Sequence, residues 1–175
     1  MSWPQGLAEL AAARWDGGPP PPVAGFVTSA FSPLAAAVAD ACLTSYFGSP
    51  PADSARGERT GIVLVSTTGD LATNAAVAGA VQAGKRVPPL LFYQSNHNAV
   101  AGYIAARWGL AGPVVCTMPG TEAEAEQVTT LLIEDGDADA ALVIAINAYP
   151  DGATEGTASL IGPATWTPPE EKRQP

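Results

Sequence analysis

The sequence predicts an α/β domain, because strand-like apolar runs alternate with segments that have helical periodicity. Residues 61–66, Gly-Ile-Val-Leu-Val-Ser, form a continuous β-branched run typical of a strand that is covered on both faces. A second run covers 140–146, and the helical patterns of 98–108 and 121–134 lie between the two. With 175 residues, the chain is long enough for one domain with a layered core.

In the first half of the chain, we expect two helices before the strand of 61–66 and one after it. Leu7–Arg14 is predicted to be a short helix, which the Pro-rich spacer of 17–22 ends. Ser32-Pro33 predicts a helix start, with a hydroxyl N-cap and proline in the first turn. Residues 48–59 are predicted to be a polar loop, and Leu71–Ala83 a helix that ends at Gly84. The predicted core stripe of the second helix comprises Leu34, Val38, Ala41, Cys42 and Ser45.

The second half is expected to start with an extended, proline-containing segment over Val87–Gln94. The elements predicted after it are a helix over Asn98–Trp108 ended by Gly109, a strand over Val114–Thr117, a helix up to about Glu134, a strand over Ala140–Ile146 and a further strand over Thr157–Ile161. Thr121 and Glu124 have the spacing of a capping box at the start of the 121–134 helix.

The predicted organisation has three parts: an N-terminal helix and spacer over 1–24, the α/β domain over 25–163, and a mobile tail over 164–175.

The net charge of −9 and the pI of about 4.3 argue against binding nucleic acid or an anionic membrane. No secretory signal and no apolar run of ~18 residues is present, so we expect a cytoplasmic protein. The charged fraction of 14% reflects either an alanine-rich composition or apolar surface that a partner covers.

An ordered set of motifs over residues 30–150 resembles the N-terminal part of a β-ketoacyl synthase. The set comprises a helix before Gly61-Ile62-Val63-Leu64-Val65-Ser66, then Asn98-Ala99-Val100-Ala101-Gly102, Gly109-Leu110-Ala111-Gly112-Pro113 and Gly136-Asp137-Ala138-Asp139. The segment SNHNAVAG is also similar to a motif of free-standing ketosynthase N-terminal-domain-like proteins from polyene and polyketide gene clusters. The resemblance implies one thiolase-like half, with a five-stranded mixed sheet and helices on both faces.

The chemistry of that family is not complete in this sequence. Ketosynthases need a thiolate at a helix N-terminus and imidazoles that activate the malonyl group, but residues 117–122 read Thr-Met-Pro-Gly-Thr-Glu. The family's cysteine aligns at about Gly120 or Thr121. Three weak catalytic candidates remain: Thr121, Cys116 and His97. We interpret them as an N-cap, a strand residue in the core and a group that satisfies backbone at a helix start.

No motif indicates a cofactor or a metal ion. Residues 79–86 approach a P-loop pattern, but Arg86 replaces the hydroxyl residue and the segment lies at the end of a predicted helix. Asp135, Asp137 and Asp139 are interpreted as solvated carboxylates of a turn.

The leading hypothesis is therefore a non-catalytic ketosynthase-like pseudoenzyme that associates with a ketosynthase, or with a ketosynthase/chain-length-factor pair, in type II polyketide or polyene biosynthesis. The family's strand pairing implies an interface, or a homodimer, through Val114, Val115, Cys116 and Thr117, a strand with no charge to block pairing. The alternatives are a small acyl transferase or hydrolase, and a module that binds an acyl chain or a carrier protein. An acidic carrier protein would need a local basic patch such as Lys85-Arg86 with Arg107.

Overall fold

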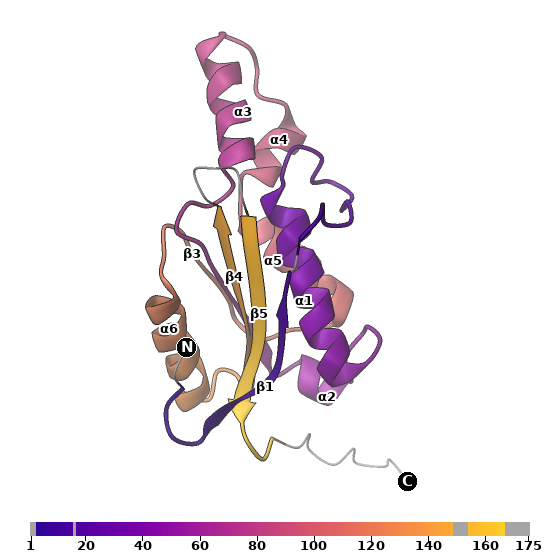
Figure 1. Ribbon diagram of the computed structural model, residues 1–175, viewed down its shortest axis with the longest axis vertical. Helices are drawn as coiled ribbons and strands as arrows, with labels where there is room; N and C mark the ends of the chain where they lie inside the picture. Colours follow the sequence, from indigo (N-terminus) through magenta and orange to yellow (C-terminus); the bar gives the residue numbers. More distant parts are fainter. Residues whose placement is uncertain (1–2, 16, 149–153, 167–175) are drawn as a thin grey trace.

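The computed structural model describes residues 3–15, 17–148 and 154–166, and it confirms the predicted class. A five-stranded mixed sheet has the order β1-β5-β4-β2-β3. Helices α1 (Phe31–Phe47) and α5 (Asn98–Trp108) cover one face, and α6 (Glu122–Glu134) covers the other (Figure 1). The strands are β1 (Leu7–Arg14), β2 (Thr60–Val65), β3 (Val114–Thr117), β4 (Ala140–Ala148) and β5 (Thr154–Pro163).

Strand β2 lies between β4 and β3 and is parallel to both. All six of its residues are buried, as the continuous apolar run of the sequence predicted. Its side chains alternate between the two faces: Ile62 and Leu64 belong to the core under α1 and α5, and Val63 and Val65 to the core under α6. Each face of the sheet therefore has its own packed layer.

The predicted N-terminal helix is wrong, because Leu7–Arg14 forms β1 and pairs antiparallel with β5. Alanine favours a helix, but eight residues are too few for a stable isolated helix in water. As a strand, the segment gains backbone hydrogen bonds with β5, and Leu10 and Ala11 pack against the core under α1. The Cys42 thiol on α1 also donates to the Ala11 carbonyl over 3.6 Å.

The start of α1 also differs from the prediction. The helix begins at Phe31, so Ser32 lies inside it and is not its N-cap. The hydroxyl of Ser29 accepts the backbone N–H of Ser32 at 2.8 Å. Leu34, Val38 and Cys42 are buried as predicted, but Ala41 and Ser45 are exposed. The loop predicted over 48–59 contains a short helix, α2 (Ser54–Gly57), whose N-cap is Asp53.

Helix α3 (Leu71–Gln82) confirms the helix predicted there and projects away from the carboxyl ends of the parallel strands (Figure 1). The extended segment predicted over Val87–Gln94 is wrong, because Pro89–Gln94 forms α4. Pro88 is extended and Pro89 occupies the first turn, where the missing N–H of proline costs no helical hydrogen bond. The prolines thus start a helix instead of preventing one.

The second half otherwise follows the prediction. Helix α5 ends at Gly109, which adopts the left-handed conformation with φ 67°. The bounds of β3 and α6 match, while β4 and β5 extend beyond their predicted ends. Most of the tail predicted to be mobile, residues 167–175, lies outside the described residues, and Trp166 stacks on Tyr46 with ring centroids 5.9 Å apart.

Candidate functional site

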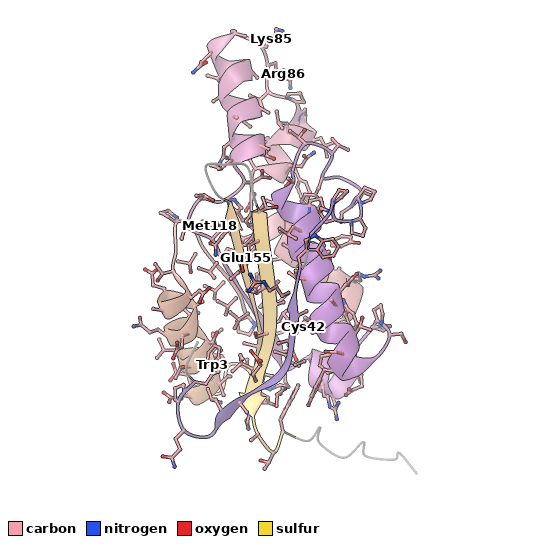
Figure 2. The ribbon with its side chains drawn as sticks, viewed as in Figure 1. Trp3, Cys42, Lys85, Arg86, Met118 and Glu155 are labelled. Carbon is pink, nitrogen blue, oxygen red and sulfur yellow. The ribbon has the colours of Figure 1, made fainter. Side chains whose placement is uncertain are left out.

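The candidate site lies at the carboxyl ends of β2 and β3. The chain leaves β2 for β3 on one side, and β4 later returns on the other side of β2. Such a reversal of strand order is where α/β sheets usually bind ligands. The loops at this point are residues 66–70 after β2 and 118–121 after β3, and Figure 2 shows Met118 here, near the base of α3.

The turn after β3 has no room for a side chain at Gly120. The Gly120 N–H donates to the Ser66 carbonyl at 2.9 Å, which ties this turn to the loop after β2. A Cβ atom on Gly120 would lie 2.6 Å from the Thr117 carbonyl oxygen and 2.7 Å from Thr117 Cγ2. A cysteine at this position would therefore require the backbone to move.

Thr121, the other position that aligns with the family's cysteine, is a helix cap. Its hydroxyl accepts the Glu124 N–H at 3.3 Å, and the Glu124 carboxylate accepts the Thr121 N–H at 2.7 Å, so the predicted capping box is present. The Thr121 hydroxyl also donates to the same carboxylate at 3.0 Å. A helix N-terminus stabilises nearby anions, and the first turn of α6 already carries the carboxylates of Glu122 and Glu124.

Burial keeps the two thiols protonated. It raises the pKa of Cys116, half-buried on β3, to about 11. It raises the pKa of Cys42, fully buried on α1, to about 12. Because the thiolate is the nucleophilic form, neither cysteine is activated at neutral pH.

His97 holds together the two ends of the α3–α4 segment. Its Nε2 atom accepts the backbone N–H of Asp70, the N-cap of α3, at 3.1 Å, and its ring packs edge-on against Phe31. Burial lowers the pKa of His97, and the nearby charge of Asp70 opposes this only in part. The imidazole is therefore neutral, with its lone pair already engaged, and it satisfies backbone at a helix start as the sequence suggested, although the helix is α3 and not its own.

The sequence analysis did not single out Gly69 and Asp70, which both lie next to His97. A Cβ atom on Gly69 would lie 3.0 Å from His97 Nε2 and 3.9 Å from Met118 Sδ, so the three residues meet. The buried Asp70 carboxylate accepts both the N–H and the hydroxyl of Thr73. An aspartate directly before an apolar helical segment, as Asp70 is, is a typical N-cap and could have been predicted from the sequence.

The three weak catalytic candidates form no catalytic unit. Among the described residues, no hydrogen bond joins the side chains of Thr121, Cys116 and His97 to one another. General-base activation of a nucleophile needs such a contact. In this geometry Thr121 and His97 stabilise the ends of helices, and Cys116 packs against the core.

Strand β3 forms an edge of the sheet. Residues Val114 to Thr117 pair in parallel with Ile62 to Val65, and no described segment pairs with the other side of β3. Val114 is 42% exposed, and the other three residues are half-buried. The register places Val115 on the α6 face, opposite the fully buried Val63.

The basic residues considered for carrier-protein docking do not act alike. Lys85 and Arg86 lie at the far tip of α3 (Figure 2). Arg107, on α5, forms an ion pair with Asp40 at 2.9 Å, and Asp40 also accepts the indole N–H of Trp108 at 2.6 Å. Arg107 is thus part of a structural cluster.

Comparisons with known proteins identify the fold. No protein-family model and no curated protein sequence matches the chain. A ketosynthase in complex with its chain length factor from Xenorhabdus doucetiae is similar over 80% of this chain and 60% of its own, with a TM-score of 0.62 and 18% identity. The ishigamide ketosynthase/chain length factor is similar over 84% of this chain and 48% of its own, with a TM-score of 0.63 and 22% identity.

These similarities show that the chain has the thiolase-like fold of ketosynthases, as the motifs predicted. It spans about half to three-fifths of the length of the structures that it matches. Separately, no helix in the described parts of the chain has the length and apolar character needed to cross a bilayer.

Proposed function

We propose that this chain is a non-catalytic ketosynthase-like accessory subunit that associates with a ketosynthase, or with a ketosynthase/chain-length-factor pair, in type II polyketide or polyene biosynthesis. The fold supports the ketosynthase-like part of the proposal. The similar solved structures are themselves described as a ketosynthase with its chain length factor, which supports a partner of this kind.

One observation carries the non-catalytic part of the proposal. At the turn where a ketosynthase needs a thiolate, Gly120 cannot carry a side chain and Thr121 is held in a capping box with Glu124. A nucleophile at the start of α6 would compete with a carboxylate for the same backbone donors. The neutral, hydrogen-bonded His97 and the protonated Cys116 provide no substitute, so an acyl transferase or hydrolase draws no support from the geometry.

The edge strand β3 supports the association part of the proposal. It is apolar, uncharged and partly exposed, so its free backbone groups are available to a strand of a partner. We expect the interface to bury at least ~1,000 Å² in total, as specific interfaces do.

The catalytic claim is tested by incubation with an acyl-loaded carrier protein or an acyl thioester, followed by intact-mass measurement. An active ketosynthase under the same conditions is the positive control. We expect an acyl adduct on the control and none on this chain. A stable adduct that disappears in Cys116→Ala or Thr121→Ala would refute the proposal and identify an acyl-handling enzyme.

The partner claim is tested by mixing the chain with a purified ketosynthase/chain-length-factor pair and measuring mass in solution. We expect a complex heavier than either component. Val115→Lys should abolish it, since the interface would then have to bury an unpaired ammonium group. Free components at every mixing ratio would contradict the claim.

A further inference from the structure

A groove lies on the side of α6 that faces away from the sheet, where the N-terminal segment passes the helix. Its volume is about 550 Å³, and its lining residues are Pro4, Ala123, Glu126, Gln127, Thr130 and Leu131. The five helical positions have the spacing i, i+3, i+4, i+7 and i+8, which makes one continuous stripe on a helix. Trp3 packs against the core under α6 and anchors the segment that carries Pro4 (Figure 2). We call this feature the α6 groove.

The packing of α6 on the sheet does not use this stripe. Ala125 and Thr129 on the other side of the helix are fully buried, and Leu132 packs against the core there. Leu131, in contrast, is 56% exposed at one end of the groove. A single exposed leucine is ordinary, but here the small Ala123 leaves space beside it along the stripe. The α6 groove can therefore receive bulky apolar side chains of a partner.

The sequence around the α6 groove is strongly acidic. Residues 108–171 include 11 aspartates and glutamates and no lysine, arginine or histidine. Six of the 11 acidic residues lie on α6 or in the turn after it: Glu122, Glu124, Glu126, Glu134, Asp135 and Asp137. The ion pairs that described residues of this stretch form belong instead to Asp139, with Arg59, and to Glu155, with Arg14. The groove thus has an acidic rim that this part of the chain leaves without a paired cation.

Several of these carboxylates are unfavourable for α6 itself. Glu122 and Glu126 are four positions apart, and like charges at this spacing destabilise a helix. Glu134 and Asp135 lie at the C-terminus of α6, where the helix dipole disfavours anions, and the last turn has no basic residue. Natural sequences break such local rules mainly at functional sites. A cationic partner would relieve both arrangements.

We propose that the α6 groove binds a basic amphipathic helix of another protein. Its apolar side chains would pack against Ala123 and Leu131, and its lysine or arginine residues would lie beside Glu126 and Glu134, which belong to the same stripe of α6. The inference does not depend on the proposed function, whose interface is the edge strand β3.

Charge argues against the other occupants. A second copy of this chain carries the same carboxylates and a net charge of −9, so its α6 would be repelled. The C-terminal residues 167–175 carry two acidic and two basic residues and offer no net positive charge. Trp166, directly before them, stacks on Tyr46 of α1, which covers the opposite face of the sheet. Nucleic acid and anionic lipid are repelled by the acidic rim.

The test is a fluorescence-anisotropy titration of the purified full chain with a designed probe. The probe is a labelled, lactam-stapled helical peptide about 20 Å long, with leucines along one side and two lysines near each end. Its control is the same peptide with glutamine in place of every lysine. We expect the basic peptide to bind at least about tenfold more tightly than the neutral one. Added salt should weaken the basic peptide and leave the neutral one almost unchanged.

Variants of the chain locate the binding surface. Leu131→Lys should weaken the basic peptide at least about tenfold, whereas Leu90→Lys, at an exposed leucine on α4, should leave its affinity unchanged. Glu126→Gln should weaken it about 2- to 5-fold. The matched control is Glu9→Gln, since Glu9 is exposed on β1 and accepts the Ser159 hydroxyl through an oxygen that glutamine retains.

Thermal unfolding provides a readout that does not depend on the probe. Glu126→Gln and Glu134→Gln should not lower the melting temperature, because each removes a charge that is unfavourable for α6. Hydrogen exchange should show that the basic peptide protects the amides of α6 and leaves those of α3 unchanged.

Four outcomes would overturn the inference. They are no saturable binding of the basic peptide up to about 1 mM, equal affinity of the basic and neutral peptides, equal effects of Leu131→Lys and Leu90→Lys, and a lower melting temperature of both glutamine variants. Equal affinity of the two peptides would assign the groove to an apolar occupant, and lower melting temperatures would assign the carboxylates to folding. The interface proposed on β3 would stand or fall separately, by the effect of Val115→Lys.

Discussion

Replacing Gly120 by alanine probes directly whether the turn after β3 can still hold a side chain. The change adds one methyl group at the position that aligns with the family's cysteine. In the native structure, that methyl group would lie 2.6 Å from the Thr117 carbonyl oxygen, 2.7 Å from Thr117 Cγ2 and 2.9 Å from Thr117 Cβ. Rotation about χ1 of Thr117 would move only Cγ2, because the carbonyl oxygen and Cβ are fixed by the backbone, so side-chain rotation cannot relieve every contact.

The expected change in the free energy of unfolding is the sum of three contributions. Relieving the overlap by a backbone shift costs about 1–3 kcal/mol, as overpacking usually does. The shift also weakens the 2.9 Å hydrogen bond from Gly120 N–H to the Ser66 carbonyl, worth about 1 kcal/mol. The lower conformational entropy of alanine in the unfolded chain returns about 0.4–1 kcal/mol. We expect a net loss of about 2 kcal/mol in the free energy of unfolding, or roughly 4–8 °C in Tm for a domain of this size.

Chemical denaturation followed by circular dichroism measures this loss, and Gly102→Ala is the matched control. Gly102 lies within α5, is exposed, and has no atom within 4 Å of its missing Cβ. The same substitution there should stabilise the protein by up to about 1 kcal/mol. The two glycines should therefore respond with opposite signs.

Equal stability of Gly120→Ala and the wild type would refute the reasoning, because the turn would then accommodate a side chain. Gly120→Cys should be destabilised at least as strongly as Gly120→Ala, since it adds a sulfur atom to the same Cβ. A stable Gly120→Cys protein that becomes acylated would show that only the thiol is missing from this site.

The remaining predictions concern the cap, the histidine and the edge strand. Thr121→Ala should lower the free energy of unfolding by about 1 kcal/mol while Thr121→Ser should be nearly neutral; equal effects of the two in a melting experiment would count against the capping box. Since burial holds the pKa of His97 below 6.5 in the folded protein, the unfolded chain binds more protons between that lowered pKa and 6.5. Stability should therefore fall as the pH is lowered through this window, by up to about 1.4 kcal/mol per pH unit. His97→Gln, which removes the only histidine of the chain, should flatten the dependence; an unchanged pH profile of denaturation midpoints would contradict this. Val115→Lys should leave the circular dichroism spectrum unchanged, because Val115 is only half-buried and the lysine stem can place its ammonium group in water. Loss of the folded spectrum would instead assign Val115 to the core.

Local signals in the sequence predicted the elements whose stability depends on nearby residues. The buried run of β2, the capping box of Thr121 and Glu124, and the end of α5 at Gly109 were read correctly. Each depends on the side chains or backbone conformation of a few consecutive residues. The absence of a cysteine from residues 117–122 was equally plain in the sequence.

Only the tertiary structure decided the features that depend on distant partners. Leu7–Arg14 is a strand because β5, some 150 residues away, provides its hydrogen bonds, a contact that outweighs the helical preference of alanine. His97 accepts the N–H of Asp70 because the fold brings the connection between α4 and α5 against the loop after β2, 27 residues away along the chain. The sequence by itself determined the α/β class and the missing thiol, since both are local properties. The fold decided that Gly120 has no room for a replacement, because the turn after β3 folds back onto Thr117 and is held there by the hydrogen bond from the Gly120 N–H to the Ser66 carbonyl, directly after the neighbouring strand β2.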